Sequence, residues 1–249
     1  MSDPRPFYDG LADLYHFIYA DWEKSIETQA AILDEIIRTD RPEAKLIADV
    51  ACGIGTQALG LARRNYEVIA SDISEQAIDR ARREASTRGL RIDFRLDDML
   101  RLSTYKDQSV DVLIACDNAI PHLLSDGEIA SAFGQFRRVI KPGGTCIISV
   151  RDYAIVGREP MRFVPYGVRT LPKGTMSIFQ LWEWEGDQYN LNMYFVGDDG
   201  AQVDTRVLRA RYYAVSIVKL IDLFTKVGFV DVRRIDDLYF QPLIVARLR

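Results

Sequence analysis

The sequence has few of the side chains that carry covalent or metal-dependent catalysis. Only two histidines occur in 249 residues, His16 and His122, and neither lies in a nucleophile motif, so no catalytic triad is indicated. The three cysteines lie in or beside apolar strand patterns, and neither their spacing nor a histidine partner suggests zinc. We interpret Cys52, Cys116 and Cys146 as small buried residues and expect no metal site.

The chain also lacks a long apolar run and an excess of positive charge. Residues 1–6 are polar and contain two prolines, which predicts neither a signal peptide nor a membrane span, so cytoplasmic localisation is the default expectation. The net charge of −4 indicates no nucleic-acid or membrane partner. The arginines between Arg80 and Arg95 lie mostly on one predicted helix that also carries acids, which favours a solvated face. A homo-oligomer is left open.

From residue 45 onward, predicted strands and helices alternate. Strands are expected at 46–50, 67–71, 92–96, 110–116 and 146–150, with helices at 56–64, at 75–88 and after the capping box Ser125-x-x-Glu128. This alternation predicts a parallel sheet that binds ligands at the carboxyl ends of its strands. Two further helices, at 7–20 and 25–38, are expected before the sheet.

After Arg151 the alternation stops. Strand patterns at 176–184, 190–196 and 201–211 are separated by glycine-containing turns, which predicts antiparallel hairpins that could cover the active site as a cap. A helix at 216–227 and two strands at 230–235 and 243–248 close the chain. We therefore expect one domain over 1–249, divided into N-terminal helices (1–44), a cofactor-binding core (45–152), a β-rich cap (153–213) and a C-terminal helix with a hairpin (214–249).

A glycine turn follows the first predicted strand of the sheet. Gly53 and Gly55 remove side chains where a ligand must approach main-chain N–H groups, and the N-terminus of the next helix suits a negative group. The spacing Gly53-x-Gly55-x-x-Ala58 also fits the dinucleotide fingerprint of nicotinamide and flavin enzymes. By itself, the turn therefore leaves both kinds of cofactor open.

Acids after successive strands separate the two cofactors. Asp49 ends the first strand, where it could reach a ligand ammonium but would repel a pyrophosphate. Asp72 follows the second strand and can accept both hydroxyls of a ribose. After the third strand comes Asp97-Asp98-Met99, in which a carboxylate can accept an adenine amino group while the thioether packs on the ring. Together these residues predict a site for an amino acid joined to a nucleoside.

Four motifs in order resemble a class I S-adenosylmethionine-dependent methyltransferase over about residues 45–150. They are Asp49-x-Ala51-Cys52-Gly53-x-Gly55-Thr56, Asp72, Asp97-Asp98 and Lys141-Pro142-Gly143-Gly144. The resemblance implies a Rossmann-like α/β fold: a mostly parallel seven-stranded sheet, helices on both faces, an antiparallel insertion after the fifth strand and a reversed final hairpin. It also implies S-adenosylmethionine as cofactor, bound by Asp49, Ala51, Gly53, Gly55, Asp72, Ile73, Asp97, Asp98 and Met99.

Two further stretches, residues 116–123 and 149–153, resemble glycine N-methyltransferase and its sarcosine and dimethylglycine relatives. In that family an arginine holds the carboxylate of the amino acid and an asparagine also binds it; by resemblance these are Arg151 and Asn118. A guanidinium does bind carboxylate in a bidentate manner. The resemblance also places tyrosines of the insertion in the methyl-transfer pocket and other residues beside the cofactor. The former are Tyr194 and Tyr213, and the latter are Cys116, His122 and Tyr19.

Methyl transfer from a sulfonium to an amine is an in-line displacement, so the protein need only align the reactants and exclude water, without an obligatory general base. The sequence hypothesis is therefore methylation of a small amino acid such as glycine or sarcosine. The alternatives are another small O- or N-acceptor, a nucleic-acid methyltransferase, which the acidic net charge disfavours, a non-catalytic S-adenosylmethionine-binding protein and a nicotinamide-dependent dehydrogenase.

Overall fold

Two sheets organise the structure, a computed structural model that describes residues 3–249. The larger sheet has seven strands in the order β10-β11-β5-β4-β1-β2-β3, and every neighbouring pair from β5 to β3 is parallel. Its strands are β1 (Leu46–Val50), β2 (Glu67–Asp72), β3 (Asp93–Leu96), β4 (Val110–Ala115), β5 (Ile140–Ser149), β10 (Val230–Ile235) and β11 (Leu243–Arg247).

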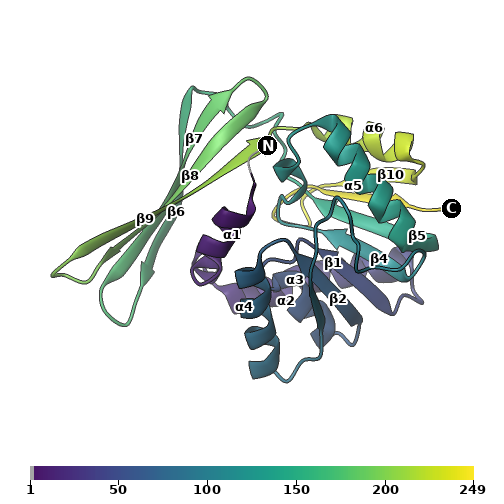
Figure 1. Ribbon diagram of the computed structural model, residues 1–249, viewed down its shortest axis with the longest axis horizontal. Coiled ribbons are helices and arrows are strands. Elements are labelled where there is room, and N and C mark those ends of the chain that lie inside the picture. The colour runs from purple at the N-terminus through teal and green to yellow at the C-terminus, as the bar shows by residue number, and fades with distance from the viewer. Residues whose placement is uncertain (1–2) are drawn as a thin grey trace.

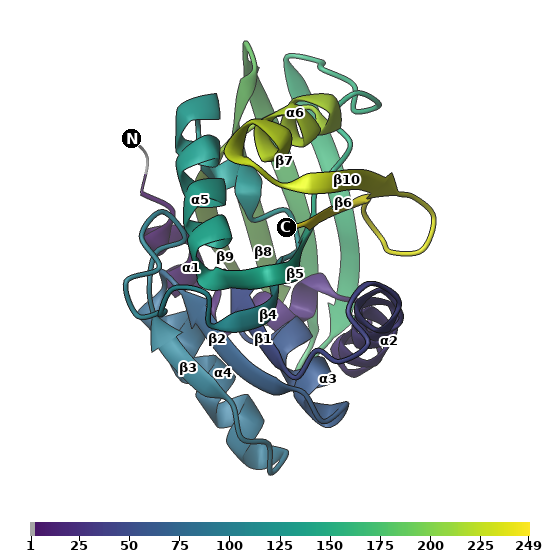
Figure 2. The same ribbon diagram turned by 90° about the vertical axis from the view of Figure 1, so that its right-hand side faces the viewer.

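Helices cover both faces of this sheet, as Figures 1 and 2 show. On one face, α2 (Trp22–Asp40), α3 (Thr56–Arg63) and α4 (Glu75–Thr87) pack on apolar residues such as Ile47 and Ile114. On the other, α5 (Asp126–Val139) and α6 (Ile217–Val227) pack on alternate residues such as Ala48 and Leu113. Because both faces are covered, β4 is buried along its whole length.

The helix boundaries follow local capping chemistry. The hydroxyl groups of Ser74, Ser125 and Ser216 each accept a hydrogen bond from the backbone N–H three residues later, at the starts of α4, α5 and α6. At the end of α6, Gly228 has φ of 102°, the left-handed conformation that commonly terminates helices. These caps agree with the helices expected from the sequence.

The second sheet is an antiparallel cap inserted between β5 and α6. It contains β6 (Met161–Thr170), β7 (Thr175–Glu185), β8 (Gln188–Asp198) and β9 (Val203–Tyr213), in that order. In Figure 1 it lies to one side of the core, with α1 (Arg5–Leu11) between the two. The N-terminal segment therefore contacts both parts: Asp9 accepts a hydrogen bond from Ser74 of the core, and Gly10 lies against Leu208 of the cap.

Three expectations about elements need correction. Residues 7–20 do not form one helix: α1 ends at Leu11, and a separate 3-10 helix, η1 (Tyr15–Ile18), follows. The sequence reading missed β6, whose Pro165 and Gly167 flank a register shift; an edge strand tolerates this because one side needs no ladder partner. β5 begins at Ile140, so the Lys141-Pro142-Gly143-Gly144 motif lies inside it.

The reversed C-terminal hairpin is present as expected, since β11 pairs antiparallel with both β5 and β10. The carboxyl ends of β2 and β4 lie against the N-terminal segment, where Ser74 donates to Asp9 and Tyr19 donates to Asp117. Within residues 3–249, no helix has the length and apolar composition needed to cross a bilayer.

Candidate active site

A pocket of about 230 Å³ lies at the carboxyl ends of β1, β2 and β4. The glycine turn after β1 forms its floor. Gly53 adopts φ of 53°, and a Cβ atom there would lie 2.8 Å from Tyr15 Cε1, so a larger residue would be strained and would collide with that ring. The backbone N–H of Gly53 donates to Asp72 Oδ2 at 2.8 Å, which joins the turn to the end of β2.

Asp72 is buried at the pocket wall. Its second oxygen, Oδ1, accepts a hydrogen bond from the N–H of Ser74 at 2.9 Å. Burial raises the pKa of the Asp72 carboxyl above its ordinary value, although the backbone N–H bonds act in the opposite direction. Each oxygen keeps a free lone pair, so this carboxylate can still accept the two hydroxyls of a ribose.

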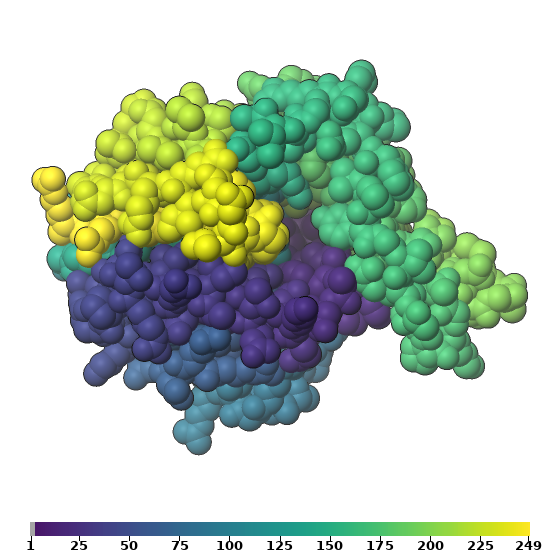
Figure 3. Space-filling model, turned by 180° about the vertical axis from the view of Figure 1, so that it is seen from behind, coloured from purple at the N-terminus to yellow at the C-terminus, as the bar shows by residue number. Residues whose placement is uncertain are grey.

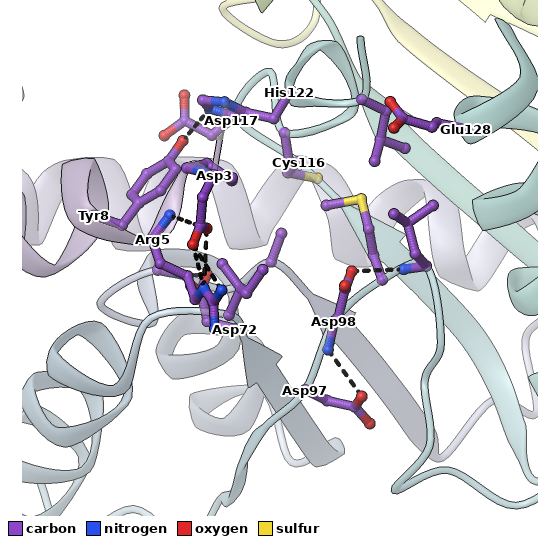
Figure 4. Close-up of a pocket in the computed structure, with 18 of the residues that line it drawn as sticks. Asp3, Arg5, Tyr8, Asp72, Asp97, Asp98, Cys116, Asp117, His122 and Glu128 are labelled. Carbon is purple, nitrogen blue, oxygen red and sulfur yellow. Dashed lines mark hydrogen bonds and ion pairs between the residues drawn. The ribbon is translucent and has the colours of Figure 1, made fainter. Parts of the chain in front are cut away.

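The acid pair after β3 divides into a structural and an open carboxylate. Asp97 accepts hydrogen bonds from both the N–H and the hydroxyl of Ser103 and Thr104, which tie down the following loop. Burial acts to raise the pKa of Asp97, but these bonds outweigh it and hold the pKa below its ordinary value. Among residues 3–249, the Asp98 carboxylate accepts a hydrogen bond only from Leu100 N–H, through Oδ1, so its Oδ2 is open to a ligand donor (Figure 4).

Aromatic rings close the opposite side of the pocket. The Tyr8 hydroxyl lies 2.7 Å from His122 Nε2 (Figure 4). Tyr15 lies against the glycine turn. Burial lowers the pKa of His122 to about 3, so the imidazole is neutral at physiological pH. The carboxylates of Asp72 and Asp98 lie on the other side of the pocket. A cationic ligand group would be attracted by these carboxylates and by the faces of the aromatic rings, and the neutral imidazole would not repel it.

A second cavity, of about 50 Å³, lies between the end of β4, the end of β5 and the inner face of the cap. Asn118 organises it: its Oδ1 accepts from the N–H of Arg151 at 2.9 Å and its Nδ2 donates to the Tyr153 hydroxyl at 3.0 Å. The Arg151 guanidinium donates to the Tyr189 hydroxyl at 3.2 Å and lies 4.6 Å from the centre of the Trp182 ring. Arg151 thus reaches the cavity from β5 with aromatic partners.

An open groove of about 1270 Å³ adjoins the second cavity. It lies between the start of α2, residues 151–156 and the loop between β10 and β11. Figure 3 shows the hollow where the N-terminal, C-terminal and cap surfaces meet. Arg151 and Tyr166 line both the groove and the second cavity, so the groove gives solvent access to that cavity.

Residues 47–144 match a family model described as a methyltransferase domain. Residues 47–144 of this chain therefore form a methyltransferase domain. A ubiquinone biosynthesis O-methyltransferase of Hahella chejuensis is 26% identical, over 80% of this chain and 90% of its own length. With other curated relatives the match is shorter: the chain spans 53% of a second such enzyme, from Alkalilimnicola ehrlichii, at 32% identity. It spans 56% of the first curated relative that it matches.

Solved structures confirm the Rossmann-like methyltransferase fold. DesVI of Streptomyces venezuelae superposes with a TM-score of 0.81 at 18% identity, over 100% of both chains. S-adenosylmethionine-bound CalS10, an amino pentose methyltransferase from Micromonospora echinaspora, has a TM-score of 0.79 at 17% identity, over 95% of both chains. S-adenosylmethionine is the cofactor of this domain, and the open carboxylates of Asp72 and Asp98 fit its ribose and adenine.

Most residues predicted to contact the cofactor do line the first pocket. They are Ala51, Gly53, Asp72, Ile73, Asp97, Asp98, Met99, Cys116 and His122. Asp49 and Gly55 do not line it, and Tyr19 lines the groove instead. Asp49 is 1% exposed, and neither of its carboxylate oxygens has a hydrogen-bond partner in residues 3–249. Contact of each residue with the cofactor remains a prediction.

The two tyrosines predicted for the methyl-transfer pocket lie outside all these cavities. Tyr194 stacks on Phe179, with ring centres 4.8 Å apart, on the face of the cap opposite the cavity-lining Met193. Tyr213 donates to Asp126 at 2.8 Å, outside the cavity. Side chains alternate along a strand, and Tyr212 therefore takes the inward position that we had expected of Tyr213.

Sequence reasoning also gave no site role to Tyr15, Asp117 or Tyr166, all of which line the cavities. For Tyr212, the sequence did contain a signal: side chains alternate along β9, so Leu208, Ala210 and Tyr212 share one face. For the N-terminal tyrosines no local signal existed, because the cap and the core together place that segment.

Proposed function

We propose that this protein transfers the methyl group of S-adenosylmethionine to the amine of a small carboxylate-bearing molecule such as glycine or sarcosine. The observation that carries the proposal is the Arg151 cation, which reaches the second cavity without an acidic partner. No aspartate or glutamate within residues 3–249 forms an ion pair with it; its guanidinium donates to the Tyr189 hydroxyl and lies over the rings of Trp182 and Tyr153.

A partly buried guanidinium without an anion is costly, since aromatic contacts replace only part of its hydration. A ligand carboxylate would supply bidentate, charge-assisted hydrogen bonds at that point. Asn118 supports this role because it holds the Arg151 backbone through its amide oxygen. The residue therefore has the position and the unsatisfied charge expected of a carboxylate anchor.

The two cavities also lie suitably for direct transfer. Tyr8 and Tyr15 line both the cofactor pocket and the second cavity, so an acceptor held by Arg151 would face the cofactor across these rings. When bound, the cofactor supplies an electrophilic methyl group on a sulfonium. The surrounding aromatic rings exclude water and favour positive charge, which are the two requirements of an in-line displacement.

An amino sugar is the second candidate acceptor. DesVI superposes over 100% of this chain, which includes the cap, and CalS10, named as an amino pentose methyltransferase, superposes over 95% of it. The open groove of about 1270 Å³ is larger than glycine or sarcosine requires. An amino sugar would use the groove, but it would leave the Arg151 charge without a carboxylate.

Kinetics with Arg151→Ala test the proposal. Loss of charge-assisted hydrogen bonds should raise the KM for sarcosine about 10- to 100-fold, while the affinity for S-adenosylhomocysteine stays nearly unchanged because Arg151 does not line the cofactor pocket. Arg206→Ala, an exposed arginine of the cap, is the matched control. Equal loss of acceptor and cofactor binding, or equally efficient methylation of amines without a carboxylate, would contradict the role of Arg151. Methyl transfer to any acceptor would exclude a purely cofactor-binding protein.

A further inference from the structure

Asp117 lies at the junction of all the cavities described above. Within residues 3–249, it is the one side chain that lines the cofactor pocket, the second cavity and the groove. Figure 4 shows it at the edge of the cofactor pocket near His122 and Tyr8. Any acceptor that enters from the groove and approaches the cofactor must therefore pass this carboxylate.

The backbone presents Asp117 in a conformation that costs energy. Asp117 and Asn118 follow β4 with φ of 60° and 63°, so two consecutive residues other than glycine occupy the left-handed region. Ser149 at the end of β5 holds both: its hydroxyl accepts from the N–H of Asp117 at 2.7 Å and its carbonyl from the N–H of Asn118 at 3.1 Å. Strain that the neighbouring strand maintains is typical of functional sites.

The carboxylate of Asp117 has one hydrogen-bond donor and no paired cation. The Tyr19 hydroxyl donates to Oδ2 at 2.6 Å, and no lysine or arginine of residues 3–249 forms an ion pair with either oxygen. Burial raises the pKa of this carboxyl, although the Tyr19 bond and the nearby Arg151 charge act in the opposite direction. Besides the adjacent Cys116 thiol, the titratable groups that face it are Tyr8, Tyr15, Tyr19, Tyr166, Tyr239 and Arg151.

We propose that Asp117 binds the ammonium group of the acceptor and takes one of its protons before methyl transfer. This proposal rests on the proposed function, in which Arg151 holds the acceptor's carboxylate. One N–H bond of the ammonium breaks and an O–H bond forms on Asp117, which leaves a neutral amine. The nitrogen lone pair then forms the new C–N bond as the C–S bond breaks. The electron pair of that bond stays on sulfur, and the positive charge passes to the methylated amine.

A ligand that carries a carboxylate and an ammonium group would explain why Arg151 and Asp117 are both unpaired at one site. Arg151 and Asp117 lie near enough to influence each other, yet they form no ion pair. A zwitterion with its carboxylate on Arg151 and its ammonium on Asp117 would neutralise both. The site is therefore built for an α-amino acid or its N-methyl derivative in the protonated form that predominates in water.

The variant Asp117→Asn provides the test, because asparagine also tolerates positive φ and can still accept the Tyr19 hydrogen bond. With sarcosine at neutral pH, kcat/KM should fall at least about 100-fold, the usual contribution of a positioned base. Aminooxyacetate carries a carboxylate, but its amine is unprotonated at neutral pH. With this acceptor, the fall in kcat/KM caused by Asp117→Asn should be far smaller than with sarcosine. The sarcosine activity of Asp117→Asn should also recover as rising pH deprotonates the free amine.

Two comparison variants separate this proposal from the one on which it rests. Arg151→Ala should impair both acceptors, because both carry a carboxylate. Asp231→Asn, the same change at an exposed aspartate with φ of 51°, should impair neither. Unchanged melting temperature and S-adenosylhomocysteine affinity would show that Asp117→Asn is folded.

Each outcome is decisive. A normal rate of Asp117→Asn with sarcosine, or an equal loss with both acceptors, would overturn the role of Asp117. If wild-type protein methylated only amines without a carboxylate, and the same pH-dependent defect appeared with them, Asp117 would stand while the Arg151 assignment fell. Methylation of hydroxyl acceptors alone would overturn both.

Discussion

Replacing Asp49 with asparagine should change how the stability of the ligand-free protein depends on pH. Asp49 is 1% exposed at the end of β1, and neither carboxylate oxygen has a hydrogen-bond partner in the described chain. Burial, with a smaller contribution from the Asp72 charge, raises the pKa of Asp49 to about 8. The native protein therefore holds this proton at neutral pH.

The direction and size of the effect follow from proton linkage. In the unfolded chain the carboxyl titrates near its ordinary value of 3.8, whereas in the native state it titrates near 8. Between these values the native state binds one more proton than the unfolded state. The free energy of unfolding should therefore fall by about 1.4 kcal/mol for each unit of rising pH. Between about pH 5 and pH 7 this amounts to about 2.7 kcal/mol, or roughly 5–10 °C in Tm.

Chemical denaturation of wild type and Asp49→Asn at several pH values, without cofactor, measures this contribution. Other titrating groups, including His122, are common to both proteins, so their effects cancel in the difference. The wild-type free energy of unfolding should decrease more steeply with pH than that of the variant. Asp231→Asn, a change at an exposed aspartate, should leave the slope unaltered. Parallel curves for wild type and Asp49→Asn would show that Asp49 is ionised in the native protein and would refute the reasoning.

Three further outcomes are expected. Asp72→Ala should weaken S-adenosylhomocysteine binding in calorimetry and leave the acceptor's KM nearly unchanged, because Asp72 lines only the cofactor pocket. Gly60→Ala should lower the free energy of unfolding by about 1–3 kcal/mol in urea denaturation, since its Cβ would lie 2.5 Å from the Ala30 Cβ where α3 meets α2. Cys52 and Cys146 are free, buried and outside the pocket lining, so a thiol reagent should modify them only when the protein unfolds, as absorbance would report.

Most of the core followed from local patterns. Buried parallel strands read as short apolar runs, and serine caps such as Ser74 mark helix starts through contacts only three residues long. The glycine turn needed only Gly53 and its neighbours, because its conformation depends on the absence of a side chain. These features were predictable since their causes lie within a few residues of the chain.

The acceptor side was less predictable, because distant segments build it. Arg151 and Asn118 were expected from family resemblance, but the absence of an acidic partner for Arg151 became visible only when β5, the cap and the N-terminal segment came together. The choice between Tyr212 and Tyr213 depended on which face of β9 turns inward. Asp117 lies in a stretch that the sequence analysis singled out, yet only tertiary packing placed it at the junction of three cavities.

By itself, then, the sequence determined the alternating α/β core, the cofactor turn and the acids that follow its strands, because hydrophobic periodicity, capping and glycine geometry act over short distances. Only the tertiary structure decided the path of residues 7–20, the inward face of the cap and the placement of Arg151 and Asp117 around one cavity. The physical reason is that long-range packing decides which side chains are buried and which charges lack a partner. The walls of this site come from segments that are far apart in the sequence.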